Sequence, residues 1–223
     1  MHIDPSSVRL VDAFKIRHTL DSDFSTFHGH STEISRYYMP KYYIPEGEWW
    51  LDARLKDEKD FFLTLESLER PKHIAAGTMF RKYLAKRLLK PGPTPNFIEH
   101  RELHLFFRLV IVDGAIVRQY LDPEFTQGGH HLVYPYIPKG EIWIEKAVRP
   151  KERPFILNHE LVERRLMSRG TSYDAAHEYA TAAEKDLRRQ HGGFYPTEDY
   201  YPWSKLTDRQ IRDKFYVHEH PTT

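Results

Sequence analysis

The sequence contains an internal repeat, and this feature limits the fold more than any other. Residues 11–21 reappear as residues 112–122, at a spacing of 101, with Val-Asp at the start, Arg inside and Leu-Asp at the end of both segments. Residues 43–52 match residues 136–145 at a spacing of 93. The first copy therefore holds about eight extra residues around residues 31–42, and the ordered agreement predicts a tandem duplication.

The repeat also predicts the secondary structure of each half. Residues 109–117 are apolar and β-branched around Asp113-Gly114, which is typical of a two-residue β-hairpin. Pro-x-Gly turns introduce short strands over residues 48–52 and 141–145. Apolar spacing predicts helices over residues 57–70, 79–90, 154–169 and 173–189. The predicted class is therefore α+β, with two copies of a β-hairpin–strand–helix–turn–helix unit packed together.

These elements suggest three parts of the chain. Residues 1–95 form the first repeat, which is degenerate and carries no site, and end in the linker Pro-Gly-Pro-Thr-Pro. Residues 96–193 form the second repeat, which carries the candidate site. Residues 194–223 form a C-terminal tail with a short helix near residues 208–215.

The absence of cysteine narrows the chemistry that this chain of 223 residues can carry out. It excludes a disulfide framework, a thiol nucleophile and cysteine-ligated zinc, whereas 14 histidines and 32 acidic residues remain as metal ligands. The 33 basic residues balance the acidic ones to a net charge of +1, so no charge excess suggests a nucleic-acid or membrane partner. Neither a signal peptide nor a transmembrane segment is evident, and we expect a cytoplasmic protein.

One predicted helix carries a pattern of metal ligands, His159-Glu160-Leu161-Val162-Glu163. Positions i and i+4 lie on one face of a helix, so the side chains of His159 and Glu163 project together. Two histidines at this spacing bind zinc in the motif His-Glu-x-x-His, in which the Glu after the first His is the general base. Here Glu163 stands in place of the second histidine, and Glu160 is the candidate base.

The next predicted helix offers a third ligand. If the two helices pair antiparallel across the intervening turn, His177 lies opposite Glu163, with His159 one turn further along. His159, Glu163 and His177 would then hold zinc or another divalent metal, with one position open for water. Glu160 could accept the proton of that water. Glu184, two turns beyond His177, is either a partner that orients a ligand or an alternative ligand.

The first repeat lacks these ligands. At a spacing of either 93 or 94 residues, no histidine of the first copy corresponds to His159 or His177. Residues that both copies share, such as Arg17 and Arg118, are expected to maintain the fold through caps and buried ion pairs. His131 has a counterpart in His30, which favours a structural role, but its Gly-Gly-His-His segment keeps it as an alternative ligand.

The motif His159-Glu160-x-x-Glu163 followed by His177 resembles the active-site helix of zincin metallopeptidases in a variant form. Glu163 stands where that family has its second histidine, and His177 stands where gluzincins carry a glutamate. The resemblance, over about twenty residues, implies a metal-dependent hydrolase that acts on a peptide. It also implies that the strand over residues 141–145 aligns the substrate. The wider pattern is similar to small bacterial and phage proteins of unassigned function.

Two other functions are compatible with the sequence. A solvated helix face in a chain rich in His and Glu produces the same pattern, and the protein would then be a structural or interaction protein, of phage type, without a metal site. This hypothesis predicts that His159, Glu163 and His177 point apart or into solvent. A nucleic-acid-binding role would require the basic residues of 81–90 to share one face, and the balanced charge argues against it.

Overall fold

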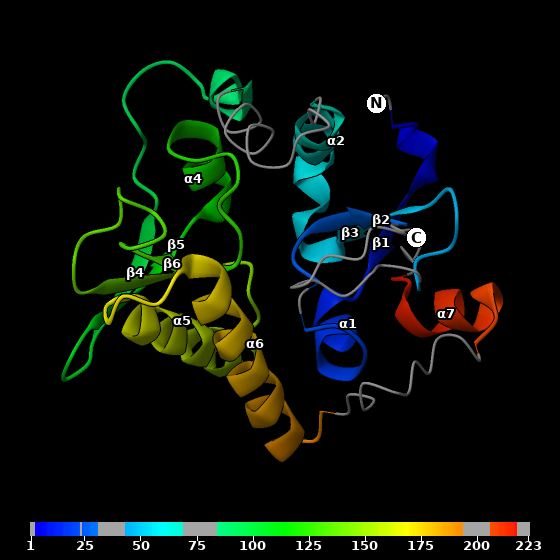
Figure 1. The fold of residues 1–223 in the computed structure, drawn as a ribbon. Coiled ribbons are helices and arrows are strands. Elements are labelled where there is room, and N and C mark those ends of the chain that lie inside the picture. Colours follow the sequence, from blue (N-terminus) through cyan, green and yellow to red (C-terminus); the bar gives the residue numbers. More distant parts are fainter. Residues whose placement is uncertain (1–2, 23, 31–42, 69–83, 194–205, 218–223) are drawn as a thin grey trace.

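Two small sheets lie at the centres of the two halves of the chain (Figure 1). The computed structural model describes residues 3–22, 24–30, 43–68, 84–193 and 206–217. In the first half the strand order is β1-β3-β2, and in the second it is β4-β5-β7-β6. The strands are β1 (Val8–Val11), β2 (Phe27–Gly29), β3 (Trp49–Asp52), β4 (Ile98–Leu103), β5 (Arg108–Val112), β6 (Gly128–His130) and β7 (Glu141–Glu145). With the helices below, the α+β class is confirmed.

Three strands of each sheet are joined in the same way. Strand β1 pairs parallel with β3, and β5 pairs parallel with β7, while β2 and β6 add antiparallel edges. In corresponding registers, Val11 lies opposite Asp52 and Val112 opposite Glu145. Because parallel neighbours need a crossover, helix α1 (Ala13–Thr19) follows β1 and helix α4 (Gly114–Tyr120) follows β5.

The β-hairpin predicted at Asp113-Gly114 is therefore wrong, and a helix begins there instead. The side chain of Asp113 caps α4, because its Oδ1 accepts hydrogen bonds from the backbone N–H groups of Ala115 and Ile116 at 3.0 and 3.3 Å. Asp12 caps α1 through the N–H of Lys15 at 3.1 Å. Aspartate is favoured both in tight turns and at helix N-caps, so the residues alone do not separate the two structures.

The longer helices agree with the sequence pattern. Helices α5 (Arg153–Met167), α6 (Tyr173–Gln190) and α7 (Asp208–Phe215) confirm the helices predicted for residues 154–169, 173–189 and 208–215. In the first half, the 3-10 helix η2 (Ala53–Glu58) leads into α2 (Lys59–Ser67). Two further 3-10 helices are η1 (Pro5–Ser7) and η3 (Lys86–Leu88). Most of the predicted helix over 79–90, the extra residues around 31–42 and the tail at 194–205 lie outside the described residues.

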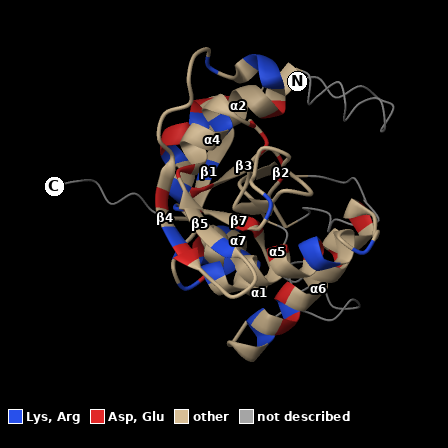
Figure 2. Ribbon diagram, turned by 90° about the vertical axis from the view of Figure 1, so that its left-hand side faces the viewer, with Lys and Arg blue, Asp and Glu red and all other residues tan. Residues whose placement is uncertain are grey.

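The last helix packs on the first half of the chain. Ile211 and Phe215 of α7 are buried in the same core as Val11 and Trp50. Figure 1 shows α6 extending from the second half towards α1, so the first half lies beside two helices from later in the sequence. Within the described part of the chain, no helix is long and apolar enough to cross a membrane. In Figure 2, basic and acidic residues are interspersed along α6 and β4.

Candidate metal centre

The antiparallel pair α5 and α6 brings three predicted ligands together. His177 Nδ1 lies 2.8 Å from Glu163 Oε2 and 3.1 Å from His159 Nε2. The third separation, between His159 Nε2 and Glu163 Oε2, is 3.7 Å. The hypothesis of a structural or interaction protein predicted that these side chains point apart or into solvent. Instead, they converge on one point.

The size of this triangle suits a tetrahedral metal ion. Zinc holds nitrogen and oxygen ligands at about 2.0–2.1 Å, which places adjacent tetrahedral ligands about 3.3 Å apart. The three separations, 2.8, 3.1 and 3.7 Å, bracket that value. Two histidines and one carboxylate are a known ligand set of catalytic zinc, which keeps its fourth position for water. His177 has the most exposed of the three side chains, at 22 %, so it marks the side open to solvent.

Further contacts hold the ligand atoms in place. His159 donates its Nδ1–H to Glu184 Oε2 at 3.1 Å, which turns Nε2 towards the other two ligands. Glu163 is held through its other oxygen, because Oε1 lies 3.1 Å from Nε2 of the fully buried His130. The backbone N–H of Leu132 donates to Nδ1 of His130 at 3.3 Å, so in the neutral ring Nε2 carries the proton. His130 therefore orients Glu163 through this hydrogen bond. With Glu160 and Glu163 it also forms a second group of possible metal ligands.

These contacts also set the charge of the carboxylate ligand. Burial alone would raise the pKa of Glu163, but hydrogen bonds from its three histidine neighbours lower it well below the usual range. The carboxylate of Glu163 is thus ionised at neutral pH, as a metal ligand must be.

The candidate base, Glu160, lies beside this cluster. One of its carboxyl oxygens lies within 4.8 Å of ligand atoms of His130 and Glu163. Its Oε1 also faces Gly128 of β6, where an added Cβ would approach it to 3.0 Å. Burial raises the pKa of Glu160 to about 8, and the negative charges of Glu163 and Glu184 add to this rise. In the metal-free protein a carboxyl group with this pKa is mostly protonated at pH 7. The positive charge of a bound divalent ion would lower the pKa towards neutrality, where the ionised form can act as a base.

No protein-family model, curated protein or solved structure matches the chain. The resemblance to zincins therefore stays a prediction, and the geometry of the described side chains is what supports a site. The histidine of the Gly-Gly-His-His segment that contacts the site is His130, not the predicted His131. Among the described residues, two groups bring possible ligand atoms close together: His159, Glu163 and His177, and His130, Glu160 and Glu163. His131 belongs to neither group.

The sequence contained one signal that could have identified His130. Side chains alternate along a strand, so Gly128 and His130 of β6 share the face that packs against α5. A glycine at position 128 lets the strand approach α5 closely, and a histidine two positions later points to the same helix. That signal becomes usable only when the pairing of β6 with β7 is known.

The first half offers no comparable group in its described part. Glu58 precedes α2 as Glu152 precedes α5, and these N-cap positions differ by 94 residues. The same spacing relates Leu65 to His159, and Leu65 is buried in an apolar core. An apolar residue thus occupies the first ligand position in the first half.

Proposed function

We propose that the protein is a metal-dependent hydrolase whose metal is held by His159, Glu163 and His177. The observation that carries the proposal is the triangle of ligand atoms, whose sides of 2.8, 3.1 and 3.7 Å suit one tetrahedral divalent ion such as zinc. When bound, such an ion would lower the pKa of a water molecule and polarise a carbonyl group. In its ionised form, Glu160 would accept a proton from such a water molecule and pass it to the leaving group.

The substrate class follows from the resemblance rather than from a pocket. Zincins hydrolyse peptides, and the same division of roles between a metal and a buried carboxylate serves amide and ester bonds in general. A peptide is the first substrate class to test.

Metal binding is the primary test. The protein, purified without a chelator or a histidine tag, is expected to contain about one equivalent of zinc, and Co²⁺ substitution should give the absorption of a tetrahedral site. His177→Gln should lower the metal content strongly. The matched control is His191→Gln, because His191 lies exposed at the end of the same helix. Wild-type protein without stoichiometric metal would refute the proposal.

Glu160 provides a second test that separates catalysis from binding. Glu160→Gln should keep the metal content and lower turnover of fluorescein-labelled casein or p-nitrophenyl acetate by about 10²–10⁴-fold, as expected for the loss of a general base. Glu178→Gln, an exposed change on α6, should leave turnover unchanged. Full turnover by Glu160→Gln would contradict the role of Glu160.

A non-enzymatic interaction protein is the second candidate. The tip of the β4–β5 hairpin favours it, because Leu103, Leu105 and Phe106 are each more than 80 % exposed. This candidate predicts that the wild-type protein binds no stoichiometric metal, so the metal analysis distinguishes the two functions.

We infer in addition that the two halves are copies of one ancestral unit. The shared strand order and the matching registers support this, as do several equivalent contacts. The indole of Trp50 donates to Glu48 and that of Trp143 to Glu141, two residues before it in each case. In related chains, the same residues should align between the two halves at spacings of 93 to 101 residues.

A further inference from the structure

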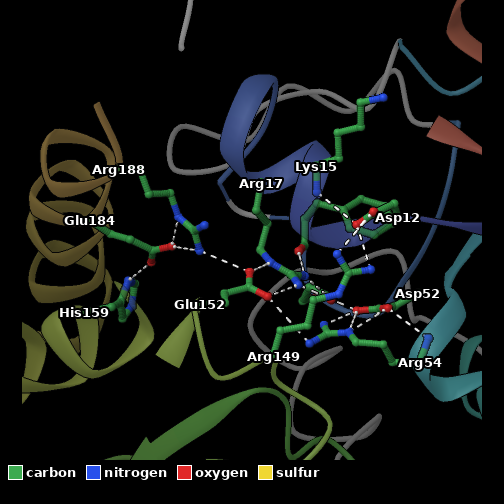
Figure 3. A network of polar contacts seen from close by, with 12 residues as sticks. Asp12, Lys15, Arg17, Asp52, Arg54, Arg149, Glu152, His159, Glu184 and Arg188 are labelled. Atoms are coloured by element: carbon green, nitrogen blue, oxygen red, sulfur yellow. Dashed lines mark hydrogen bonds and ion pairs between the residues drawn. The ribbon is translucent and has the colours of Figure 1, made fainter. Parts of the chain in front are cut away.

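A row of buried charged side chains leads from the candidate metal centre into the first half of the chain (Figure 3). Glu184, which accepts the hydrogen bond from His159, also accepts one from Arg188 Nε through its Oε1 at 2.8 Å. Arg188 Nη2 lies 3.2 Å from Glu152 Oε1. Glu152 in turn accepts two hydrogen bonds from Arg17 of α1, at 2.5 and 3.0 Å. The charges alternate in sign along the whole row.

Glu152 connects the two halves. The side chains of Glu152, Arg188 and Arg17 are all 0 % exposed, so none of them has solvent as an alternative partner. Arg17 is held independently by the backbone carbonyls of Phe24 and Ser25, at 2.9 and 3.0 Å. The first half therefore presents a fixed guanidinium that determines where the carboxylate of Glu152 lies.

The guanidinium of Arg188 contacts two carboxylates, those of Glu184 and Glu152. Its Nε and Nη2 both contact Oε1 of Glu184, while Nη2 also reaches Glu152. The charge of Glu152 draws Arg188 away from a two-oxygen pairing with Glu184, which is the favoured geometry of such a pair. Without that charge, among the described residues only the hydrogen bond from His159 competes with Arg188 for Oε2 of Glu184. That pairing would draw Oε2 away from His159 and release the imidazole ring.

An equivalent pair on the other side of the molecule lacks this connection. Arg118 of α4 pairs with Glu58 at the N-cap of α2, at 2.6 and 2.8 Å, as Arg17 pairs with Glu152 at the N-cap of α5. Arg118 also contacts the carbonyl of Phe125 and the carboxylate of Glu145. Among the described residues, this second pair contacts no ligand of the candidate centre. It is therefore a matched control for the first.

We propose that Arg17 and Glu152 are positioning residues, through which the first half of the chain fixes the His159 ring for metal binding. The proposal rests on the proposed function, since it assigns a purpose to the half whose described residues contribute no ligand to the candidate centre. Residues that orient a metal ligand through a hydrogen bond typically change metal affinity by about 10–100-fold when they are replaced. Because Glu152 acts through Arg188 and Glu184, we expect a loss near the lower end, about tenfold.

The experiment compares Glu152→Gln with Glu58→Gln. Each variant neutralises one carboxylate of a pair between the halves, and urea unfolding of the metal-free proteins measures how much stability each loses. Zinc affinity is measured by competition with a chelator. In parallel, the Nδ1–H proton of His159 is followed by NMR in metal-free protein, and it is assigned by its absence in His159→Gln. If Glu152→Gln does not fold, Arg17→Lys replaces it, with Arg118→Lys as its match.

The expected result is a difference between the two variants in readouts that stability alone does not change. Glu152→Gln should weaken zinc binding about tenfold and broaden or shift the His159 proton, while Glu58→Gln should change affinity less than twofold. Equal affinities and equal proton signals in the two variants would overturn the positioning role. If wild-type protein binds no zinc but the proton responds only to Glu152→Gln, the positioning of His159 stands and the proposed function fails.

Discussion

Gly114 and Glu145 in the second half correspond to Ala13 and Asp52 in the first, at spacings of 101 and 93 residues. A Cβ at Gly114 would collide with the carboxyl group of Glu145. Glu145 in turn must keep its position, because both of its oxygens contact the buried guanidinium of Arg118. In the first half, the acid is one methylene shorter and a methyl group stands in place of the glycine hydrogen. The two differences compensate each other.

This compensation predicts a non-additive pair of substitutions. Gly114→Ala should lower the free energy of unfolding by about 1–3 kcal/mol, because the added methyl group displaces Glu145 from Arg118. Adding Glu145→Asp should restore at least half of that loss by recreating the pair found in the first half. Urea unfolding of the wild type, both single variants and the double variant measures the coupling. Strict additivity of the two changes would contradict the explanation.

At the scale of elements, the side chain of Asp113 caps the N-terminus of α4. Asp113 accepts two backbone hydrogen bonds at the N-cap, and its Oδ2 also pairs with Lys146. Asp113→Ala should lower the free energy of unfolding by about 1 kcal/mol, the usual cost of losing an N-cap. Asp113→Asn keeps the acceptor and should lose less than half as much in a urea titration. Equal losses for both variants would indicate that the ion pair, not the cap, stabilises the helix.

The sequence predicted those elements whose signal lies within the element itself. Helices α5 and α6 are amphipathic over several turns, so their limits and the approach of His177 to Glu163 followed from spacing alone. The start of α4 did not, because Asp-Gly serves a hairpin and a helix cap equally well. His130 and Glu152 were not predicted because their partners are distant. Arg17 and Glu152 are 135 residues apart, and no local pattern encodes that pairing.

The sequence predicted that the shared arginines form buried ion pairs, but it did not predict all of their partners. The buried ion pairs expected at Arg17 and Arg118 are confirmed. The sequence did not reveal that each arginine reaches a glutamate of the other half, at the N-cap of α5 or of α2. Those glutamates make no side-chain cap of their own helix. Their carboxylates instead form ion pairs with an arginine of the other half.

At the scale of the whole molecule, an ion pair between the halves, Arg17 with Glu152, makes the free energy of unfolding depend on pH. Burial alone would raise the pKa of Glu152, but Arg17, Arg188 and Arg54 lower it from 4.5 to about 2. Since the folded-state pKa lies below the unfolded value, Glu152 stabilises the fold above pH 4.5, and that stability is lost as the pH falls towards 2. The full difference corresponds to about 3 kcal/mol, of which about 2 kcal/mol is lost by pH 3.

Glu152→Gln should therefore be less stable than the wild type at pH 7 and should lose less further stability on acidification. Between pH 7 and pH 3, its free energy of unfolding should fall by about 2 kcal/mol less than that of the wild type. Urea unfolding in the presence of a chelator measures both curves without a contribution from metal binding. Glu46→Gln, an exposed change, should follow the wild-type curve. Parallel curves for Glu152→Gln and wild type would mean that this carboxylate titrates alike in the folded and unfolded chains, and that its pairing with Arg17 does not hold the halves together.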